Sequence, residues 1–212
     1  MRIRITFSKL GALRYTGHLD LHRLWERAAR RAELPLAYSQ GFHPQPKTNM
    51  AAALPLGFSS RCEMIDMRLE HEIPLDGLRE KLQQTLPTGI QVSSIELVDE
   101  RAPALQTQVA AAEYEVTLTE SVNGSDLKRR IDSVMESGSI LRERRGKTYD
   151  LRPLIEELTL IPGPSPEGGR EKILMRLSAR EGATGRPEEV LDVMGIAFAG
   201  TRIERTRLIF YS

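Results

Sequence analysis

The feature that most constrains the fold is the order in which strand-like and helix-like hydrophobic patterns follow one another. Strands are predicted in three segments: residues 2–7, 62–69 and 90–98. Apolar residues recur at helical spacing in two others: residues 18–33 and 74–86. With a short strand predicted over 34–38, the order is β-α-β-β-α-β, which is typical of a ferredoxin-like domain.

The second half of the chain repeats this order with one additional strand. Its predicted elements are a strand at 113–118, a helix capped by Ser125, paired strands around Gly146 within 139–161, a strand at 173–177, a short helix opened by Pro187 and a strand at 203–211. Residues 162–169, PGPSPEGG, are predicted to form a flexible loop. Residues 99–111 lack a clear period and contain Pro103, so we interpret them as a connector.

We therefore predict an α+β protein made of two tandem ferredoxin-like domains, each with an antiparallel sheet and helices on one face. The predicted organisation is a first domain at 1–98, the connector at 99–111 and a second domain at 112–212. The two halves share the order of elements without a residue-by-residue repeat.

Charge is distributed unevenly along the chain. The net charge is only +1, but residues 1–61 carry ten Lys or Arg against three acidic residues, which is +7, and the remainder carries −6. Such asymmetry indicates that the amino-terminal third faces an anionic partner, and nucleic acid is the commonest one. The alternative is a solvated basic face without a partner.

Cysteine content and hydropathy indicate the compartment. Cys62 is the only cysteine, which excludes disulfides within the chain and metal or iron–sulfur sites that need three or four thiolates. No run of about 18 apolar residues occurs, and the start MRIRITFSK alternates charged with apolar residues where a signal peptide needs a continuous apolar segment. We expect a cytoplasmic protein that neither spans a membrane nor carries a cofactor.

A row of arginines on the first predicted helix is the strongest candidate for binding an anion. The row consists of Arg23, Arg27, Arg30 and Arg31, which lie opposite the Leu/Trp stripe of that helix. Guanidinium groups bind phosphate oxygens in a bidentate manner, so the row is suited to following a nucleic-acid backbone. The same face is also compatible with solvation or with docking of an acidic protein.

The segment YSQGFHPQPKT, residues 38–48, is the second candidate. It is predicted to link the second and third strands of the first domain, and long loops in compact domains are usually functional or disordered. Two prolines restrict its backbone and a glycine permits a turn, which favours order. Four of its residues are suited to binding a phosphate or another oxyanion: Ser39, the backbone of Gly41, His43 and Lys47.

Three histidines offer weaker candidates for chemistry. His18 and His22 lie four residues apart on the first helix, a spacing with which two imidazoles can share a metal, and His43 is a possible third ligand. No glutamate follows the first histidine as in a zinc-protease helix, so we expect no metal site. As a general acid or base beside Tyr15 or Lys47, one of these histidines would assist attack of a ribose 2′-hydroxyl on its phosphate. The alternative for His18 is a packed residue at the helix start.

A second basic cluster is predicted at a hairpin tip in ILRERRGK, residues 140–147. It consists of Arg142, Arg144, Arg145 and Lys147, on both sides of a turn at Gly146. Such a tip is suited to clamping a nucleic-acid backbone, or to discouraging aggregation between sheet edges. The chain lacks a Walker loop, a G-x-G-x-x-G segment, a nucleophile elbow and the aromatic strand of an RNA-recognition motif. If RNA binds, phosphate contacts and shape should therefore dominate over base stacking.

Several segments together resemble a known bacterial family. They are the stretch from Arg14 to Glu63, KTYDLRP at 147–153, RPEEVLDVMG at 186–195 and ERTRL at 204–208. Over nearly its whole length the chain is similar to the radical-SAM-associated family, which occurs beside or fused behind a B12-binding radical SAM protein. The chain lacks the cysteine triplet of a radical SAM enzyme, and Trp25 stands where the corrinoid motif begun by Asp20 and His22 needs a glycine. The resemblance therefore implies a companion of that enzyme.

The tandem arrangement also looks like that of CRISPR repeat-processing endoribonucleases, which usually carry a glycine-rich loop near the carboxyl end. Here the best match, GIAFAG at 195–200, is apolar and short. We therefore expect a non-catalytic RNA-binding accessory protein of a radical SAM system. The alternatives are a metal-independent endoribonuclease that uses His18 or His43, and a protein-interaction module that docks the radical SAM enzyme.

Overall fold

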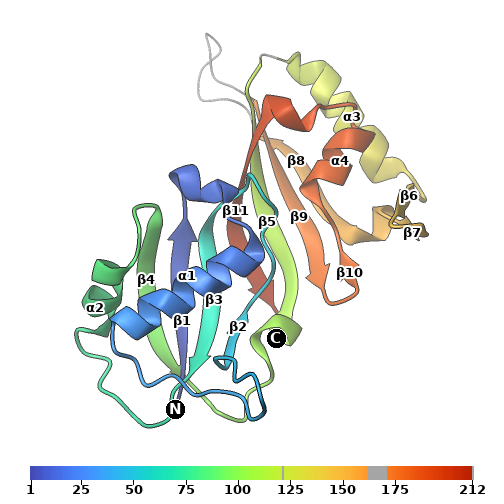
Figure 1. Ribbon diagram of the computed structural model, residues 1–212. Coiled ribbons are helices and arrows are strands. Elements are labelled where there is room, and N and C mark those ends of the chain that lie inside the picture. Colours follow the sequence, from blue (N-terminus) through green and yellow to red (C-terminus); the bar gives the residue numbers. More distant parts are fainter. Residues whose placement is uncertain (121, 162–170, 212) are drawn as a thin grey trace. The chain divides into compact units, whose positions relative to one another are not determined.

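The first half of the chain builds an antiparallel sheet in the order β4-β1-β3-β2 (Figure 1). Its strands are β1 at Arg2–Lys9, β2 at Thr48–Met50, β3 at Ser59–Arg68 and β4 at Ile90–Val98. The structure is a computed structural model that describes residues 1–120, 122–161 and 171–211. Two units are distinguished within it, Met1–Val109 and Ala110–Ser212. The predicted loop at 162–169 lies outside the described residues.

Two helices cover one face of the first sheet: α1 at His18–Arg31 and α2 at Leu78–Thr85. Ile3, Ile5 and Phe7 alternate along β1 and are fully buried beneath them. Trp25 of α1 is also fully buried, and its ring meets that of Phe7 edge to face with centroids 4.6 Å apart. The apolar alternation of β1 and the stripe of α1 therefore form one core, as the periodicity predicts.

Two boundaries in this unit differ from the prediction because of proline and glycine. The predicted strand at 34–38 is reduced to isolated bridges, Leu36 with Leu69 and Tyr38 with Pro46, and β2 forms after the loop instead of before it. Proline has no backbone N–H to donate to a ladder, so Pro35 and Pro46 interrupt pairing there. Similarly, α2 begins after Gly77, whose φ of 72° is not helical, and excludes Pro74.

The sheet face opposite the helices carries a buried ionic cluster of Arg2, Arg4 and Asp66. Both arginines donate to the Asp66 carboxylate, Arg2 through Nη2 at 2.6 Å and Arg4 through Nε at 2.8 Å. Arg2 also donates to the carbonyl oxygens of Ala102 at 2.7 Å and Pro103 at 2.8 Å. The segment predicted as a connector is thus attached to the sheet. It also contains a 3₁₀ helix, Leu105–Gln108, and the first residues of the next strand.

The second unit is a second antiparallel arrangement centred on β9. Its elements are β5 at Val109–Leu118, α3 at Gly124–Glu136, β6 at Leu141–Arg144, β7 at Lys147–Asp150, β8 at Ile155–Ile161, β9 at Lys172–Arg180, β10 at Ala183–Thr184, α4 at Pro187–Val193 and β11 at Thr201–Phe210. β9 pairs antiparallel with β5, β8 and β10, and β11 lies beside β5. β6 and β7 form a separate hairpin, which confirms the paired strands predicted around Gly146.

Two details of the second unit correct the prediction. The helix α3 is capped by Asn123, whose side-chain oxygen accepts from the backbone N–H of Ser125 and Asp126, so Ser125 itself is not the cap. The part of the predicted paired strands that follows Gly146, within 139–161, is divided by a 3₁₀ turn, Arg152–Leu154, in which Pro153 cannot continue a ladder. The predicted α+β class is confirmed, with mostly antiparallel pairing and four α-helices in the described ranges. None of these helices is long and apolar enough to cross a membrane.

Candidate functional site

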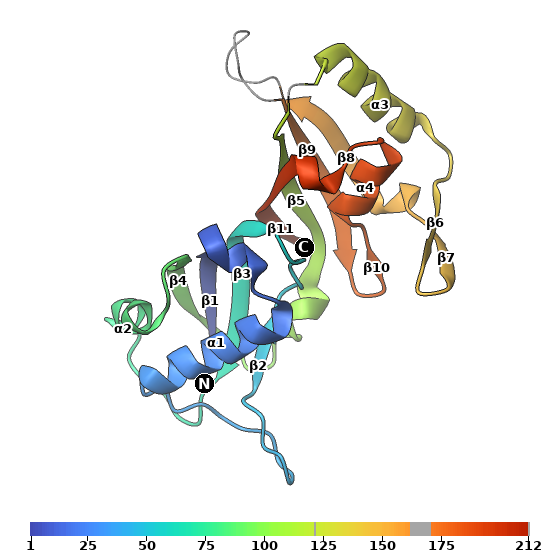
Figure 2. The same cartoon turned by 45° about the horizontal axis from the view of Figure 1, so that its top comes forward.

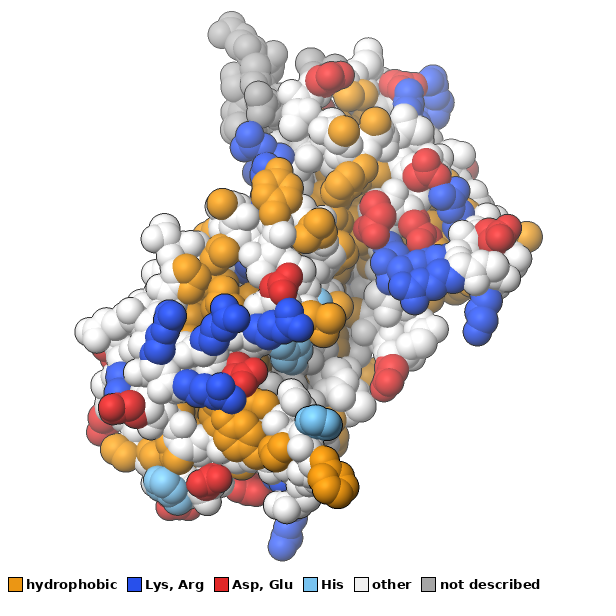
Figure 3. All heavy atoms as spheres, in the orientation of Figure 1, with side chains coloured by type: hydrophobic (Ala, Val, Ile, Leu, Met, Phe, Trp, Pro, Cys, Tyr) orange, Lys and Arg blue, Asp and Glu red, His pale blue; other side chains and the backbone are white. Residues whose placement is uncertain are grey.

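The outer face of α1, which we call the arginine face, carries the four predicted arginines, all exposed to solvent. They are Arg23, Arg27, Arg30 and Arg31. Figure 3 shows the gathering of Lys and Arg side chains over this helix. Arg23 pairs with Asp20 at 3.4 Å and Arg30 pairs with Glu26 at 2.7 Å. Within the described part of the chain, Arg27 and Arg31 form no ion pair. Two of the four guanidinium groups therefore have no acidic partner among the described residues, and their role in binding stays a prediction.

The segment from Tyr38 to Lys47 is a closed hairpin, which we call the 38–47 hairpin. It connects α1 to β2, so the predicted place between two strands of the sheet is wrong. Its arms are joined by Ser39 N–H to the Gln45 carbonyl at 2.8 Å and by Lys47 N–H to the Ala37 carbonyl at 2.8 Å. Figure 2 shows this segment projecting beyond the start of β2. These two hydrogen bonds between the arms are consistent with the prediction that the segment is ordered.

The predicted binding residues of this hairpin differ in their surroundings. The hydroxyl of Ser39 accepts from the Gln45 N–H at 3.0 Å, so it helps to close the hairpin. Gly41 has a φ of 126°, a conformation that side chains rarely adopt, and an added Cβ would meet no atom within 4 Å. Gly41, His43 and Lys47 are exposed. The hairpin therefore offers donors to a ligand from its tip and from its returning arm.

Tyr38 joins the hairpin to the arginine face, a link that sequence reasoning missed. Its hydroxyl accepts from Arg30 Nε at 3.2 Å, and the Arg30 guanidinium lies 5.9 Å from the ring centroid. The hydrogen bond to Tyr38, and then the charge of Glu26, raise the pKa of Arg30. The arginine face and the 38–47 hairpin are therefore parts of one surface, whose shared point is the Arg30–Tyr38 contact.

The structure brings two of the three candidate histidines together. The rings of His18 and His22 meet edge to face with centroids 4.8 Å apart, whereas His43 lies in the exposed hairpin. Throughout the described ranges, no group of three or more His, Cys, Asp or Glu residues is placed to hold a metal ion. The three histidines therefore do not form the metal set that we considered. Burial, and then the charge of His18, lower the pKa of His22 below its usual 6.5.

This lowered pKa predicts that stability decreases as pH falls below about 6.5, the usual pKa of a histidine. His22 binds a proton more readily in the unfolded chain than in the folded one, so its contribution is complete above the unfolded pKa. This contribution to the free energy of unfolding is lost as pH falls through the pKa that His22 has in the folded protein. Urea unfolding at several pH values should show this loss, and His22→Gln should flatten it. An unchanged pH dependence in His22→Gln would show that another group is responsible.

The β6–β7 hairpin presents the second predicted basic cluster. Arg145 and Gly146 form its turn with φ of 51° and 73°, as in a two-residue hairpin turn. Arg142 pairs with Asp192 of α4, while Arg145 and Lys147 are exposed. Sequence reasoning missed Arg186, whose pKa is lowered by burial first and by the charge of Arg144 next. The proximity of Arg144 to Arg186 arises from the fold, and no spacing along the chain indicates it.

Comparison with protein families assigns the chain. A family model described as "Uncharacterized protein conserved in bacteria (DUF2344)" matches residues 2–187. The chain belongs to the DUF2344 family. No curated protein matches this DUF2344 chain.

Solved structures similar to the DUF2344 protein include a Cbf5-Nop10-Gar1 complex, with a TM-score of 0.50 and 10% identity over 97% of this chain and 48% of that chain. The archaeal box H/ACA sRNP Nop10-Cbf5 complex has a TM-score of 0.46 and 12% identity over 97% of this chain and 47% of that chain. The DUF2344 chain thus spans about half the length of these chains. At 10% identity the first likeness concerns the fold alone.

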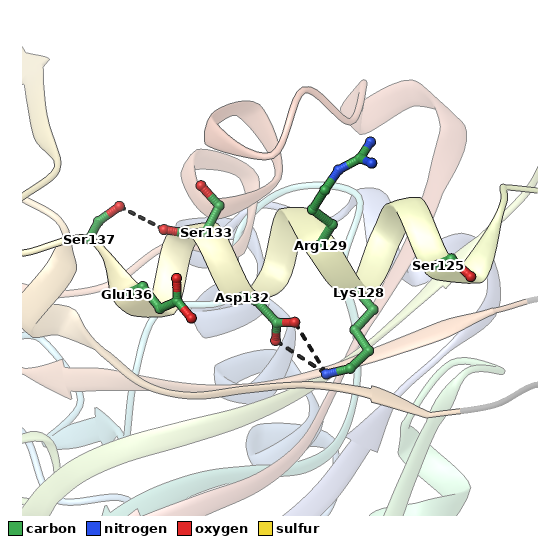
Figure 4. Close-up of a pocket in the computed structure, with 7 residues that line it drawn as sticks. All are labelled: Ser125, Lys128, Arg129, Asp132, Ser133, Glu136 and Ser137. Atoms are coloured by element: carbon green, nitrogen blue, oxygen red, sulfur yellow. Dashed lines mark hydrogen bonds and ion pairs between the residues drawn. The ribbon is translucent and has the colours of Figure 1, made fainter.

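Two surface hollows of the DUF2344 protein lie in its second unit. One of about 540 Å³ runs along α3 and is lined by Ser125, Lys128, Arg129, Asp132, Ser133, Glu136 and Ser137. Figure 4 shows that these side chains come from α3, except that of Ser137, which follows the end of the helix, and that Lys128 pairs with Asp132. Another, of about 490 Å³, is bordered by the GIAFAG segment and Arg130. Arg130 donates to the Met194 carbonyl at 2.9 Å, so its guanidinium is already engaged at the end of α4.

Proposed function

We propose that this DUF2344 protein is an RNA-binding accessory protein, which holds structured RNA through its phosphates. The observation that carries the proposal is the pair Arg27 and Arg31, exposed on α1 without an acidic partner in the described ranges. Between and beside them, Arg23 and Arg30 keep their guanidinium groups at the surface, with exposed fractions of 68% and 57%. The phosphates of an anionic polymer would supply the missing counter-charge to Arg27 and Arg31 without displacing any internal contact.

The dimensions of the α1 face suit a nucleic-acid strand. From Arg23 to Arg31 the helix rises about 12 Å, and residues four apart place their Cβ atoms about 6 Å from one another. Lys47, exposed in the 38–47 hairpin, is the fifth cationic side chain that we assign to this site. About five cationic side chains are therefore available to one backbone. The likeness to the Cbf5-Nop10-Gar1 complex is confined to the fold and does not itself support RNA binding. The support for the RNA proposal comes from the arginines of α1.

We also propose that the protein works beside a B12-binding radical SAM protein. The support for this is the resemblance of the sequence to the radical-SAM-associated family. Because the chain has one cysteine, it cannot itself supply the three thiolates of a radical SAM cluster. Its proposed part is to hold RNA for the partner enzyme.

The tandem ferredoxin-like architecture belongs to this proposal. In the first unit the supporting observation is the order β4-β1-β3-β2, with every neighbouring pair antiparallel. In the second unit β8, β9, β5 and β11 follow one another in the sheet. In both units this matches the split βαβ pattern. Such a fold hosts many functions, so the site residues and not the fold carry the functional proposal.

Binding through phosphates predicts a steep dependence on salt. With about five phosphate contacts, the logarithm of the association constant should fall with the logarithm of salt concentration at a slope of about −4. Fluorescence anisotropy of a labelled stem-loop RNA, from about 50 to about 200 mM salt, should show roughly 200-fold weaker binding. Absence of binding at low salt would contradict the proposal. Shortening of the RNA in the presence of EDTA would instead favour the endoribonuclease alternative, for which His18 and His43 are the candidate residues.

A further inference from the structure

Phe42 at the tip of the 38–47 hairpin is the most exposed large apolar side chain in the described part of the protein. Its exposed fraction is 102%, whereas the next, Leu141, reaches 72%. A phenylalanine without any cover from its own chain leaves its whole ring in water, where apolar area is unfavourable. Scattered exposed leucines are ordinary, but a complete ring at the end of a projection requires a reason.

The backbone beneath Phe42 is held in place. Ser39 and Gln45 are joined by two hydrogen bonds, Ser39 N–H to the Gln45 carbonyl at 2.8 Å and Gln45 N–H to the Ser39 hydroxyl at 3.0 Å. Pro44 and Pro46 fix two φ angles in the returning arm. The ring is thus presented from an ordered loop, and less conformational entropy is lost when something packs on it.

The surroundings of Phe42 indicate what kind of group packs on the ring. Apart from Pro44 and Pro46, the residues around it in the hairpin are polar, basic or glycine: Gln40, Gly41, His43, Gln45 and Lys47. Protein-binding hot spots lie within a wider apolar core that excludes water, and this hairpin has no second exposed large hydrophobic residue. A single ring among polar groups is instead suited to a nucleobase, which offers a flat π face and polar edges.

The position of the hairpin connects this ring to the arginine face. Tyr38, at the base of the hairpin, bonds to Arg30 of α1. Resting on the proposed RNA function, we propose that Phe42 stacks on an unpaired base of the RNA whose phosphates lie along α1. The ligand class is therefore a structured RNA with an unpaired nucleotide next to its held backbone, because a base inside a duplex does not expose its face. Base stacking then adds to the phosphate contacts that sequence reasoning expected to dominate.

The test compares two labelled RNAs of equal length, a stem-loop with unpaired nucleotides and a fully paired duplex. Phe42→Ala should bind the stem-loop about 10-fold more weakly, within the range typical of one stacked base, and should bind the duplex like wild type. Phe42→Trp should keep the affinity, and its added fluorescence should be quenched on binding the stem-loop. Trp25, the only tryptophan of wild type, is fully buried and supplies a constant background. Leu141→Ala, which removes another exposed apolar side chain, is the matched control and should change neither affinity.

Three outcomes would overturn the inference. If Phe42→Ala binds both RNAs like wild type while both still bind, Phe42 does not stack and the phosphate proposal stands. If Phe42→Ala loses a copurifying protein and no RNA affinity, the tip serves a protein partner. If wild type binds neither RNA, the proposed function and this inference fail together.

Discussion

Replacing Asp66 with alanine is expected to lower the free energy of unfolding of the first unit by about 3–5 kcal/mol. The Asp66 carboxylate accepts hydrogen bonds from both Arg2 and Arg4, and the exposed fractions of Asp66 and Arg2 are 2% and 3%. Removing the carboxylate leaves buried guanidinium groups without their counter-charge, and desolvated charge is costly. Urea unfolding followed by the fluorescence of Trp25 reports on this unit, because that residue lies in its core.

Lys81→Ala is the matched control for Asp66→Ala. It removes the ion pair between Lys81 and Glu33, whose side chains have exposed fractions of 48% and 82%. Exposed pairs contribute about 0–1 kcal/mol, so this variant should unfold close to wild type. If Asp66→Ala were no more destabilising than Lys81→Ala, the buried cluster would not be a main contributor to stability.

Reversing both uncompensated charges, Arg27→Glu with Arg31→Glu, is expected to weaken RNA binding at least about 100-fold at low salt. The change removes two phosphate contacts and places two carboxylates against the same backbone. Arg23 and Arg30 already have acidic partners on α1, so the other two carry the greater part of the free positive charge. Both side chains are exposed and belong to no ion pair in the described ranges, so the fold should be retained. Anisotropy with the stem-loop RNA measures the effect.

Lys128→Glu with Arg129→Glu provides the same change in net charge on α3. These side chains are exposed, with fractions of 68% and 79%. If binding depended only on total charge, the two double variants would weaken it equally, and the assignment of the RNA surface to α1 would be wrong. We expect the α3 variant to bind within a few-fold of wild type.

The predictable elements are those with one face buried in the core and the other exposed to solvent, because this produces a regular alternation of apolar and polar residues. Ile3, Ile5 and Phe7 alternate with charged or polar residues because one face of β1 is buried, and Trp25 continues the stripe of α1 for the same reason. The strand after the 38–47 hairpin was missed because Thr48–Met50 is three residues long, too short for its period to be read. The start of α2 was misplaced because Gly77 breaks the helical conformation within an apolar stripe.

The arginine face was predictable because helical geometry alone places its members on one side. By contrast, the contact of Arg30 with Tyr38 depends on how the chain turns after α1. The electrostatic effect of Arg144 on Arg186, and the hydrogen bond of Arg2 to Ala102, each involve segments dozens of residues apart. Such contacts are set by tertiary packing, which no local period encodes. His43 was grouped with His18 and His22 by residue type, and the hairpin separates it from a shared metal set.

The attachment of residues 102 and 103 to Arg2 determines where the first unit can be divided from the rest for separate expression. A fragment ending at residue 98, the last residue of the predicted first domain, would remove both carbonyl acceptors of the Arg2 guanidinium. It would also remove Glu100, which pairs with the amino group of Met1 at 2.6 Å. A fragment ending at Val109 retains all of these partners. Residues 99–109 are therefore part of the first unit and contribute contacts to it, so truncations should be designed to keep them.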